Sequence, residues 1–202
     1  MKTITLLNEK GGVGKTTLAV HIAAGLAIRG RRVLLIDADA QANATYLMRL
    51  PKKNAGLFGL LVDEDEFGHI LYRPEYAAWG GNNKAEGHVM VLPGNVKTRL
   101  IPMAIDAQDD LLRERLEELA GRVDVVVIDT PPTPSMLHKF LYAATDYMIY
   151  PVECQALAVD GLAKSWKRME AINEYRARIG TPAMKLLGVQ PTKYHVQTNS
   201  HN

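Results

Sequence analysis

Short apolar runs rich in β-branched residues alternate along the chain with longer stretches of helical periodicity. The runs cover residues 4–7, 33–36, 89–92, 125–128, 148–152 and 186–189. Strands that are apolar without polar alternation are typical of a parallel sheet that is buried on both faces. We therefore predict an α/β fold, with a doubly wound, mostly parallel sheet and helices on both faces.

Helices are predicted between these strands, where apolar residues recur at three- and four-residue spacing. They cover residues 16–29, 109–120, 135–144 and 159–179. Residues 51–87 show little periodicity, and we predict a short helix near residues 57–62 followed by a long surface loop. Ligands of such sheets bind at the carboxyl ends of the strands, so polar residues that follow the apolar runs are candidates for a site.

Composition limits the class of protein. A chain of 202 residues with 47% hydrophobic and 23% charged residues suits one α/β domain, which we predict over residues 1–202. The single cysteine, Cys154, excludes a disulfide framework and a four-cysteine metal site. No apolar run reaches the length of a bilayer and no leader precedes the first strand, so we expect a cytoplasmic protein without a membrane partner.

A glycine-rich run, which we call the phosphate loop, joins the first predicted strand to the first predicted helix. It reads Asn8-Glu9-Lys10-Gly11-Gly12-Val13-Gly14-Lys15-Thr16-Thr17. Glycines let the backbone N–H groups approach phosphate oxygens, and the helix N-terminus adds its dipole. Lys15 is expected at the β- and γ-phosphates, Thr16 at Mg²⁺ and Thr17 near the α-phosphate. The alternative, an ordinary glycine-rich turn, is disfavoured by the strand, loop and helix order.

Aspartates follow two other predicted strands. Asp37 and Asp39 leave the strand at residues 33–36 two positions apart, which places both carboxylates on the same side of an extended chain. One can hold Mg²⁺ through water while the other orients water at the γ-phosphate. Asp129 ends the strand at residues 125–128 in the Walker B manner and can also bind Mg²⁺. Taken alone, such aspartates more often cap a turn, but the phosphate loop favours the chemical interpretation.

The phosphate loop departs from the common pattern GxxxxGK[ST], because Glu9 stands at the first glycine and Lys10 follows it. This is the deviant Walker A form KGGxGKT[ST], and the chain resembles the ParA/MinD superfamily of ATPases, most closely the ParA (Soj-like) partition ATPases. The resemblance implies ATP and Mg²⁺ as ligands and a nucleotide-sandwich homodimer. It also implies that Lys10 reaches across the dimer to the phosphates bound by the other subunit.

The aspartate segments carry the same resemblance. Residues 37–45 are similar to the family's switch I pattern, D-x-D-P-Q-x-N-A-T, and residues 129–132 to its switch II pattern, D-x-P-P. By this resemblance Asp39 is needed for hydrolysis. Ala40 stands where the family usually has Pro, and Ala42 where it often has Gly, so we expect a less rigid turn and altered hydrolysis.

The likeness extends to Pro151-Val152-Glu153, to residues 156–162 and to Thr192-Lys193-Tyr194 with Thr198, and so spans residues 3 to about 198. Relatives usually continue with another helix, a strand and a closing helix that contribute to the adenine pocket. The resemblance therefore implies either a domain truncated at the C-terminus or a short variant of it, and it leaves the nucleotide affinity open.

Basic residues are concentrated in the C-terminal part of the chain. Residues 155–202 hold seven Lys/Arg against three acids, although the whole chain carries only +2. Five of these cations lie on the helix predicted at residues 159–179: Lys164, Lys167, Arg168, Arg176 and Arg178. They form either an ordinary solvated face or, as the resemblance implies, a nonspecific DNA surface that would associate the protein with the nucleoid. The six histidines are scattered, and we assign none of them as a metal ligand.

The leading hypothesis is an ATP-dependent partition switch. It dimerises on ATP, binds DNA and lets go after slow hydrolysis stimulated by a ParB-like activator, and so segregates a plasmid or chromosome. A MinD-like or other ParA-type positioning ATPase for a non-DNA cargo is the first alternative, although residues 190–202 have no hydrophobic face for a membrane.

Two further alternatives belong to other functional classes. One is a metabolic P-loop enzyme of the dethiobiotin synthetase or nitrogenase iron protein type, although one cysteine cannot supply the cluster ligands of the iron protein. The other is an adaptor that binds nucleotide poorly.

Overall fold

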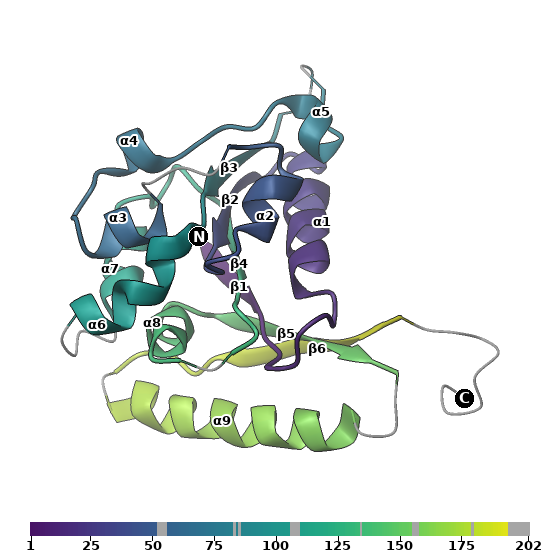
Figure 1. The fold of residues 1–202 in the computed structure, drawn as a ribbon, viewed down its shortest axis with the longest axis vertical. Helices are drawn as coiled ribbons and strands as arrows, with labels where there is room; N and C mark the ends of the chain where they lie inside the picture. Colours follow the sequence, from purple (N-terminus) through teal and green to yellow (C-terminus); the bar gives the residue numbers. More distant parts are fainter. Residues whose placement is uncertain are drawn as a thin grey trace.

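The structure of the chain is a computed structural model that describes residues 1–51, 56–82, 84, 86–105, 110–133, 135–154, 158–178 and 180–193. In the segment 158–178 it describes the backbone throughout, and all side chains except those of residues 158–162, 164, 165 and 168. Figure 1 shows a central sheet with helices packed on both sides.

The described elements follow one another as strands alternating with helices. They are β1 (Lys2–Leu6), α1 (Lys15–Ile28), β2 (Arg32–Asp37), α2 (Asn43–Leu47), α3 (Leu57–Leu61), α4 (Phe67–Ile70), α5 (Tyr76–Trp79), β3 (His88–Leu92), the 3₁₀ helix η1 (Val96–Leu100), α6 (Ile101–Ala104), α7 (Leu111–Glu117), β4 (Val125–Asp129), α8 (Leu137–Ala143), β5 (Tyr147–Glu153), α9 (Ala158–Arg178) and β6 (Lys185–Thr192).

All six described strands run parallel in one sheet, in the order β3-β2-β4-β1-β5-β6. β4 lies between β2 and β1, so Asp129 at its end is opposite both Asp37 of β2 and Leu6 of β1. The carboxyl ends of these strands therefore meet at one edge of the sheet, where the phosphate loop and both aspartate segments begin. The predicted parallel α/β fold is confirmed.

The apolar core occupies both faces of the sheet, and β2 shows why its sequence lacks polar alternation. Leu34 and Ile36 pack in a cluster with residues of α3, α7 and α8, whereas Val33 and Leu35 pack on the opposite face against α1. A third, smaller cluster joins Met169 of α9 to β5. The residues of β2 from Val33 to Asp37 are thus buried whichever way they point.

Residues 51–87 differ from the sequence-based prediction. The short helix is confirmed as α3, but the long surface loop is wrong. The segment contains α4 and α5, and Phe67, Ile70 and Trp79 on these helices are buried. Helices of four residues carry too few positions to show a period, and tertiary burial of single apolar residues holds them instead.

None of the helices that the structure describes is both long and apolar enough to cross a membrane.

Candidate nucleotide site

The phosphate loop turns from β1 into α1 through two residues with positive φ. Gly12 has φ of 75° and Gly14, the N-cap of α1, has φ of 88°. This left-handed region is open to glycine without steric cost, whereas a side chain would be strained there. The helix that follows is 14 residues long, so its first N–H groups and its dipole lie at the loop and favour an anion.

A cleft of about 340 Å³ opens over this loop. Its lining includes Gly12, Gly14, Lys15, Thr16, Thr17, Asp39, Gln41, Asn43, Thr130 and Pro132. The structure thus brings most of the predicted phosphate-binding residues together with Asp39 from switch I. Gly11 and Val13 belong to the same loop but do not line the cleft, since the Val13 side chain is buried beneath it.

Lys15 lies buried at the base of the cleft. Its Nζ donates a hydrogen bond to the carbonyl oxygen of Lys10 at 3.1 Å, which folds the side chain back under the loop. Burial lowers the pKa of Lys15, and the carboxylates of Asp129 and Asp39 oppose that shift. The ammonium group is therefore held between the loop and the acidic strand ends.

Asp37, the last residue of β2, is fully buried and already engaged by the protein. Its Oδ2 accepts hydrogen bonds from the Thr45 amide at 2.8 Å and hydroxyl at 2.7 Å, and its Oδ1 accepts one from the Asp39 amide at 3.2 Å. Burial raises the pKa of Asp37 to about 6, against the effect of these hydrogen bonds. Asp37 thus anchors the switch I segment (residues 37–45), and its role at Mg²⁺ stays a prediction.

Asp129 is equally buried but differs in its contacts. Neither of its carboxylate oxygens has a hydrogen-bond partner among the residues that the structure describes. Burial, followed by repulsion from Asp37, raises its pKa to about 8, whereas the neighbouring Thr16 hydroxyl and Lys15 lower it. Buried carboxylate oxygens beside a threonine hydroxyl form a donor set that suits Mg²⁺.

Asp39 lies at the mouth of the cleft. Its Oδ1 accepts a hydrogen bond from the Gln41 amide at 2.9 Å, which orders the turn into α2. Ala42, at the position where the family often has Gly, has φ of 58°, so an alanine adopts the left-handed conformation here. The half-buried Asp39 lines the same cleft as the phosphate loop, and its role in orienting a water molecule stays a prediction.

The loop after β4 is tied by a histidine. The Ser135 amide donates to Nδ1 of His138 at 3.1 Å, so Nε2 carries the proton and lies 3.3 Å from the Pro131 carbonyl oxygen. Burial lowers the pKa of His138, so the ring stays neutral and keeps this arrangement. The spacing of the histidines along the chain forms no metal-ligand pattern, so the sequence assigns His138 no role; its partners in the structure are groups of one loop.

Lys10 points out of the phosphate loop rather than into its own cleft. Its Nζ lies 2.5 Å from Oε2 of Glu153, and Nζ of Lys193 lies 2.6 Å from Oε1 of the same carboxylate. Both lysine side chains are 57% exposed, whereas that of Glu153 is 9% exposed. Sequence reasoning quoted Glu153 and Lys193 only as part of the resemblance. The available signal was their position at the carboxyl ends of strands.

The predicted basic surface of α9 is corrected at one residue. Arg176 is only 2% exposed, and its guanidinium donates to the carbonyl oxygens of Tyr142, Ala143, Thr145 and Pro182. It is therefore a buried cap for α8 and no DNA contact.

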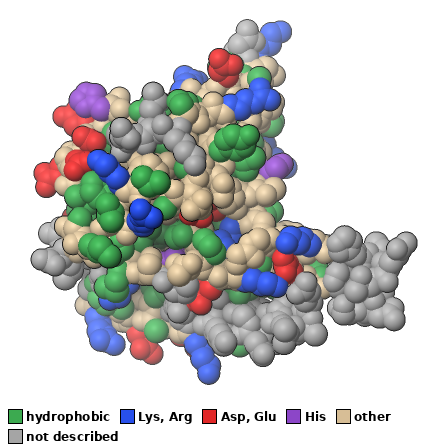
Figure 2. Space-filling view, viewed as in Figure 1, with side chains coloured by type: hydrophobic (Ala, Val, Ile, Leu, Met, Phe, Trp, Pro, Cys, Tyr) green, Lys and Arg blue, Asp and Glu red, His purple; other side chains and the backbone are tan. Residues whose placement is uncertain are grey.

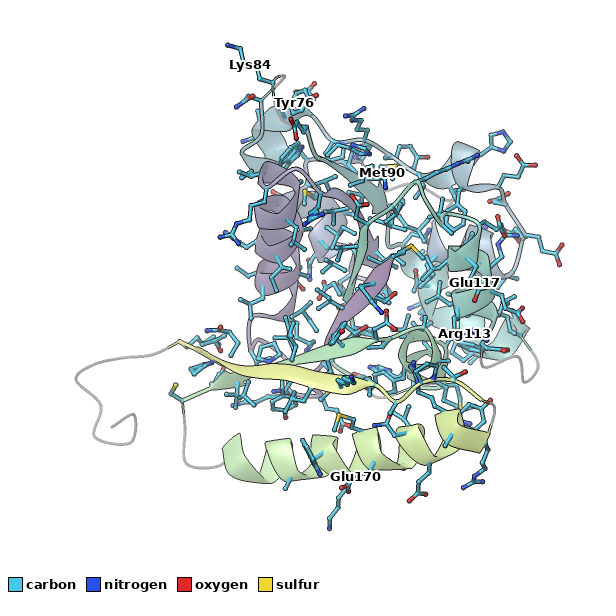
Figure 3. All side chains as sticks on the ribbon, turned by 180° about the vertical axis from the view of Figure 1, so that it is seen from behind. Tyr76, Lys84, Met90, Arg113, Glu117 and Glu170 are labelled. Carbon is cyan, nitrogen blue, oxygen red and sulfur yellow. The ribbon has the colours of Figure 1, made fainter. Side chains whose placement is uncertain are left out.

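Two of the other predicted cations, Lys167 and Arg178, are exposed on the described surface of α9. The side chains of Lys164 and Arg168 lie outside the described residues. The exposed side of α9 also carries acids. Figure 3 shows Glu170 pointing away from the sheet, where it accepts a hydrogen bond from the Trp166 indole at 2.8 Å.

Among the described residues, no group of three or more His, Cys, Asp or Glu side chains lies together as a metal cluster. Mg²⁺ that arrives with a nucleotide needs no such cluster, because it keeps several waters and phosphate oxygens as ligands. The hydroxyl of Thr16 and the carboxylate of Asp129 stay the predicted protein ligands of such an ion.

A glycine loop between strand and helix, a buried lysine, and an acid on the adjacent strand together define a P-loop nucleoside triphosphatase. Comparisons with known proteins identify the branch. A family model described as AAA domain matches residues 1–180. The chromosome-partitioning ATPase Soj of Thermus thermophilus is 33% identical over 98% of the chain and 72% of its own length. The chain belongs to the ParA/Soj family of partition ATPases.

Solved structures share the fold. A protein of Mycobacterium smegmatis described as cobyrinic acid a,c-diamide synthase, with bound ATP analogue and magnesium, superposes with a TM-score of 0.83. It is 29% identical, and the match covers 100% of this chain and 76% of that one. A plasmid partition protein of Borrelia burgdorferi bound to AMPPNP has the same fold, with a TM-score of 0.76 at 23% identity over 99% of this chain and 78% of its own.

Proposed function

We propose that this protein is an ATP-dependent DNA-partition switch. Two protomers bind ATP·Mg²⁺, close into a nucleotide-sandwich dimer, bind DNA nonspecifically and separate after slow hydrolysis stimulated by a ParB-like activator. The observation that carries the proposal is the different placement of two lysines in one loop. Lys15 is buried in its own cleft, whereas Lys10 is exposed beside it. Lys15 would serve the nucleotide of its own protomer, and Lys10, whose ammonium group lies at Glu153 outside the cleft lining, would serve a second one.

The residues of the cleft have separate tasks. Lys15 and the N–H groups of the phosphate loop bind the phosphates and neutralise the negative charge that develops on transfer. Thr16 and Asp129 would hold Mg²⁺, which supplies further charge neutralisation at the phosphates. Asp39 orients the attacking water and receives its proton. Lys10 from the second protomer completes the site, so hydrolysis depends on dimerisation.

Sedimentation velocity with a nonhydrolysable ATP analogue and Mg²⁺ tests the dimer. We expect the wild-type protein to be a monomer with ADP and a dimer with the analogue, and Lys10→Ala to remain a monomer with either. Lys2→Ala removes an exposed lysine at the other end of β1 and serves as the matched control. An analogue-bound dimer of Lys10→Ala as stable as that of the wild type would contradict the proposal.

DNA binding is the second part of the proposal and rests on the exposed Lys167 and Arg178 of α9. In electrophoretic mobility shifts with the ATP analogue, replacing both by Ala is expected to weaken binding. The slope of log affinity against log salt should fall by about one for each phosphate contact removed. Lys84→Ala is the control, because Figure 3 shows this lysine at the opposite end of the molecule from α9. A double variant indistinguishable from Lys84→Ala would contradict the DNA surface.

Alternative functions give different results in the same assays. A positioning ATPase for a non-DNA cargo would dimerise with the analogue but show no salt-dependent DNA binding. An ATP-dependent synthetase, the activity in the description of the M. smegmatis structure, would consume ATP only with a small-molecule acceptor. Hydrolysis that DNA and an activator protein stimulate without such an acceptor favours the partition switch.

A further inference from the structure

Three charged side chains meet at the outer end of the phosphate loop. Glu153 is the last residue of β5, and its nearly buried carboxylate lies between Nζ of Lys10 at 2.5 Å and Nζ of Lys193 at 2.6 Å. The two lysines hold the pKa of Glu153 down at about 2, so the carboxylate is charged throughout the physiological range. Figure 2 shows basic and acidic side chains close together in this region, beyond the ends of β5 and β6.

The backbone around this cluster is firmly connected. Asn8 joins the loop to β5, since its Nδ2 donates to the Pro151 carbonyl oxygen at 2.7 Å and its Oδ1 accepts from the Lys10 amide at 2.8 Å. On the other side, the Thr192 hydroxyl lies 3.0 Å from the Val13 carbonyl oxygen, and Thr192 is opposite Glu153 in the β5–β6 register. The lysine side chains, each more than half exposed, are therefore the parts of the cluster that can move.

We propose that Glu153 is a positioning residue that holds Lys10 on its own protomer until a nucleotide on the second protomer competes for it. Lys193 has the complementary task of neutralising Glu153 after Lys10 has left. This inference rests on the proposed function, because it presumes that Lys10 moves to the phosphates of the second protomer.

The charges explain why a third residue is needed. With both lysines in place the cluster carries +1, and after departure of Lys10 the pair of Glu153 and Lys193 is neutral. Without Lys193, departure of Lys10 would leave a nearly buried carboxylate unpaired, which is strongly unfavourable. Lys193 therefore makes the release of Lys10 easier, whereas Glu153 makes it harder.

This logic predicts opposite effects for two single variants. Glu153→Gln removes the carboxylate that holds Lys10 and should tighten the analogue-bound dimer, while Lys193→Met should weaken it, each by about fivefold. The double variant should match Glu153→Gln, because Lys193 acts only through Glu153. Lys185→Met removes an exposed lysine at the start of β6 and should match the wild type.

The double variant also separates this role from direct phosphate binding by Lys193, whose Nζ lies near Gly12 of the phosphate loop. If Lys193 bound phosphate itself, Lys193→Met would weaken the dimer of the Glu153→Gln variant as much as it weakens the wild-type dimer. The measurement is the dimer dissociation constant from sedimentation velocity, at low and moderate salt. Tighter dimers of Glu153→Gln together with suppression of the Lys193→Met defect support the proposal.

A second measurement examines the contact without the dimer. In the nucleotide-free protein with ¹³C-methylated lysines, Glu153→Gln should shift the resonances of Lys10 and Lys193 and leave that of Lys185 in place. An unchanged Lys10 resonance overturns the proposal, as does a Glu153→Gln dimer no tighter than that of the wild type. If the wild-type protein forms no analogue-bound dimer, the proposed function fails and this inference fails with it. The two failures are therefore distinguishable.

Discussion

At the residue scale, the buried acids at the strand ends make the nucleotide-free protein sensitive to pH. Asp129 and Asp37 have pKa values raised above those of ordinary carboxylates, so the folded protein keeps protons that the unfolded chain releases. The stabilisation is complete below the unfolded pKa of about 4 and is lost as the pH rises towards 8.

We therefore expect the melting temperature in chelator to fall from about pH 4 to about pH 8, and Asp129→Asn to reduce that fall because it removes the larger shift. Thermal melts across this range measure the effect. Asp63→Asn changes an exposed aspartate and serves as the control. If the melting temperatures of the wild type and of Asp129→Asn fell equally with pH, the raised pKa of Asp129 would be contradicted.

Ala42 gives a second prediction at the same scale. Its φ of 58° costs about 1 kcal/mol or more for an alanine, while glycine loses about 0.4–1 kcal/mol more in chain entropy on folding. Ala42→Gly should therefore raise the free energy of unfolding by about 0.5 kcal/mol in urea titrations. Ala44→Gly, two residues on inside α2, should lower it by about 1 kcal/mol. If the two substitutions changed the free energy of unfolding in the same direction, this account of the turn would be contradicted.

The contacts of Glu153 with Lys10 and Lys193 could not be predicted from the sequence, and the reason is physical. Lys10 and Glu153 are 143 positions apart, and Glu153 and Lys193 are 40 apart. No local period or spacing connects them, because only the strand order of the sheet brings them together. By contrast, Lys15 and Thr16 belong to a motif of consecutive residues, which can be recognised in the sequence. The structure places both at the cleft.

At the element scale, continuous apolar runs predicted the six described strands to within a few residues. In the interior strands β2 and β4 burial on both faces explains these runs, whereas the edge strand β6 is apolar but largely exposed. The helices that the sequence did not predict, including α2, α4 and α5, have four or five residues and no amphipathic period. The prediction that Arg176 lies on the surface was wrong for a different reason. Its charge suggested a surface, but the open carbonyl groups at the end of α8 provide enough acceptors to bury a guanidinium.

Arg176 accordingly supports a stability prediction for α8 and α9. Arg176→Met should lower the free energy of unfolding by about 2–4 kcal/mol, because several buried carbonyl groups lose a charged donor. Arg178 lies two residues further along α9 and is exposed. Arg178→Met should therefore change the free energy of unfolding by less than about 0.5 kcal/mol. Chemical denaturation measures both. Similar small effects for the two variants would contradict the buried, stabilising role of Arg176.

At the scale of the whole molecule, membership of the ParA/Soj family and the parallel sheet place the phosphate loop, switch I and Asp129 at one edge. Figure 1 shows the same edge reaching the ends of β5 and β6, from which Glu153 and Lys193 come. Each protomer therefore holds Lys15 inside its own cleft and exposes Lys10 beside it. The central claim is that a complete site needs Lys15 from one protomer and Lys10 from the other.

Subunit mixing tests that claim most directly. Lys10→Ala and Lys15→Ala proteins, each expected to be inactive alone, are mixed in equal amounts, and ATP hydrolysis is measured under the conditions in which the wild type is active. A mixed dimer holds one intact composite site, so the mixture should regain about a quarter of the wild-type rate. A mixture as inactive as its components, or a Lys10→Ala protein as active as the wild type, would contradict the account.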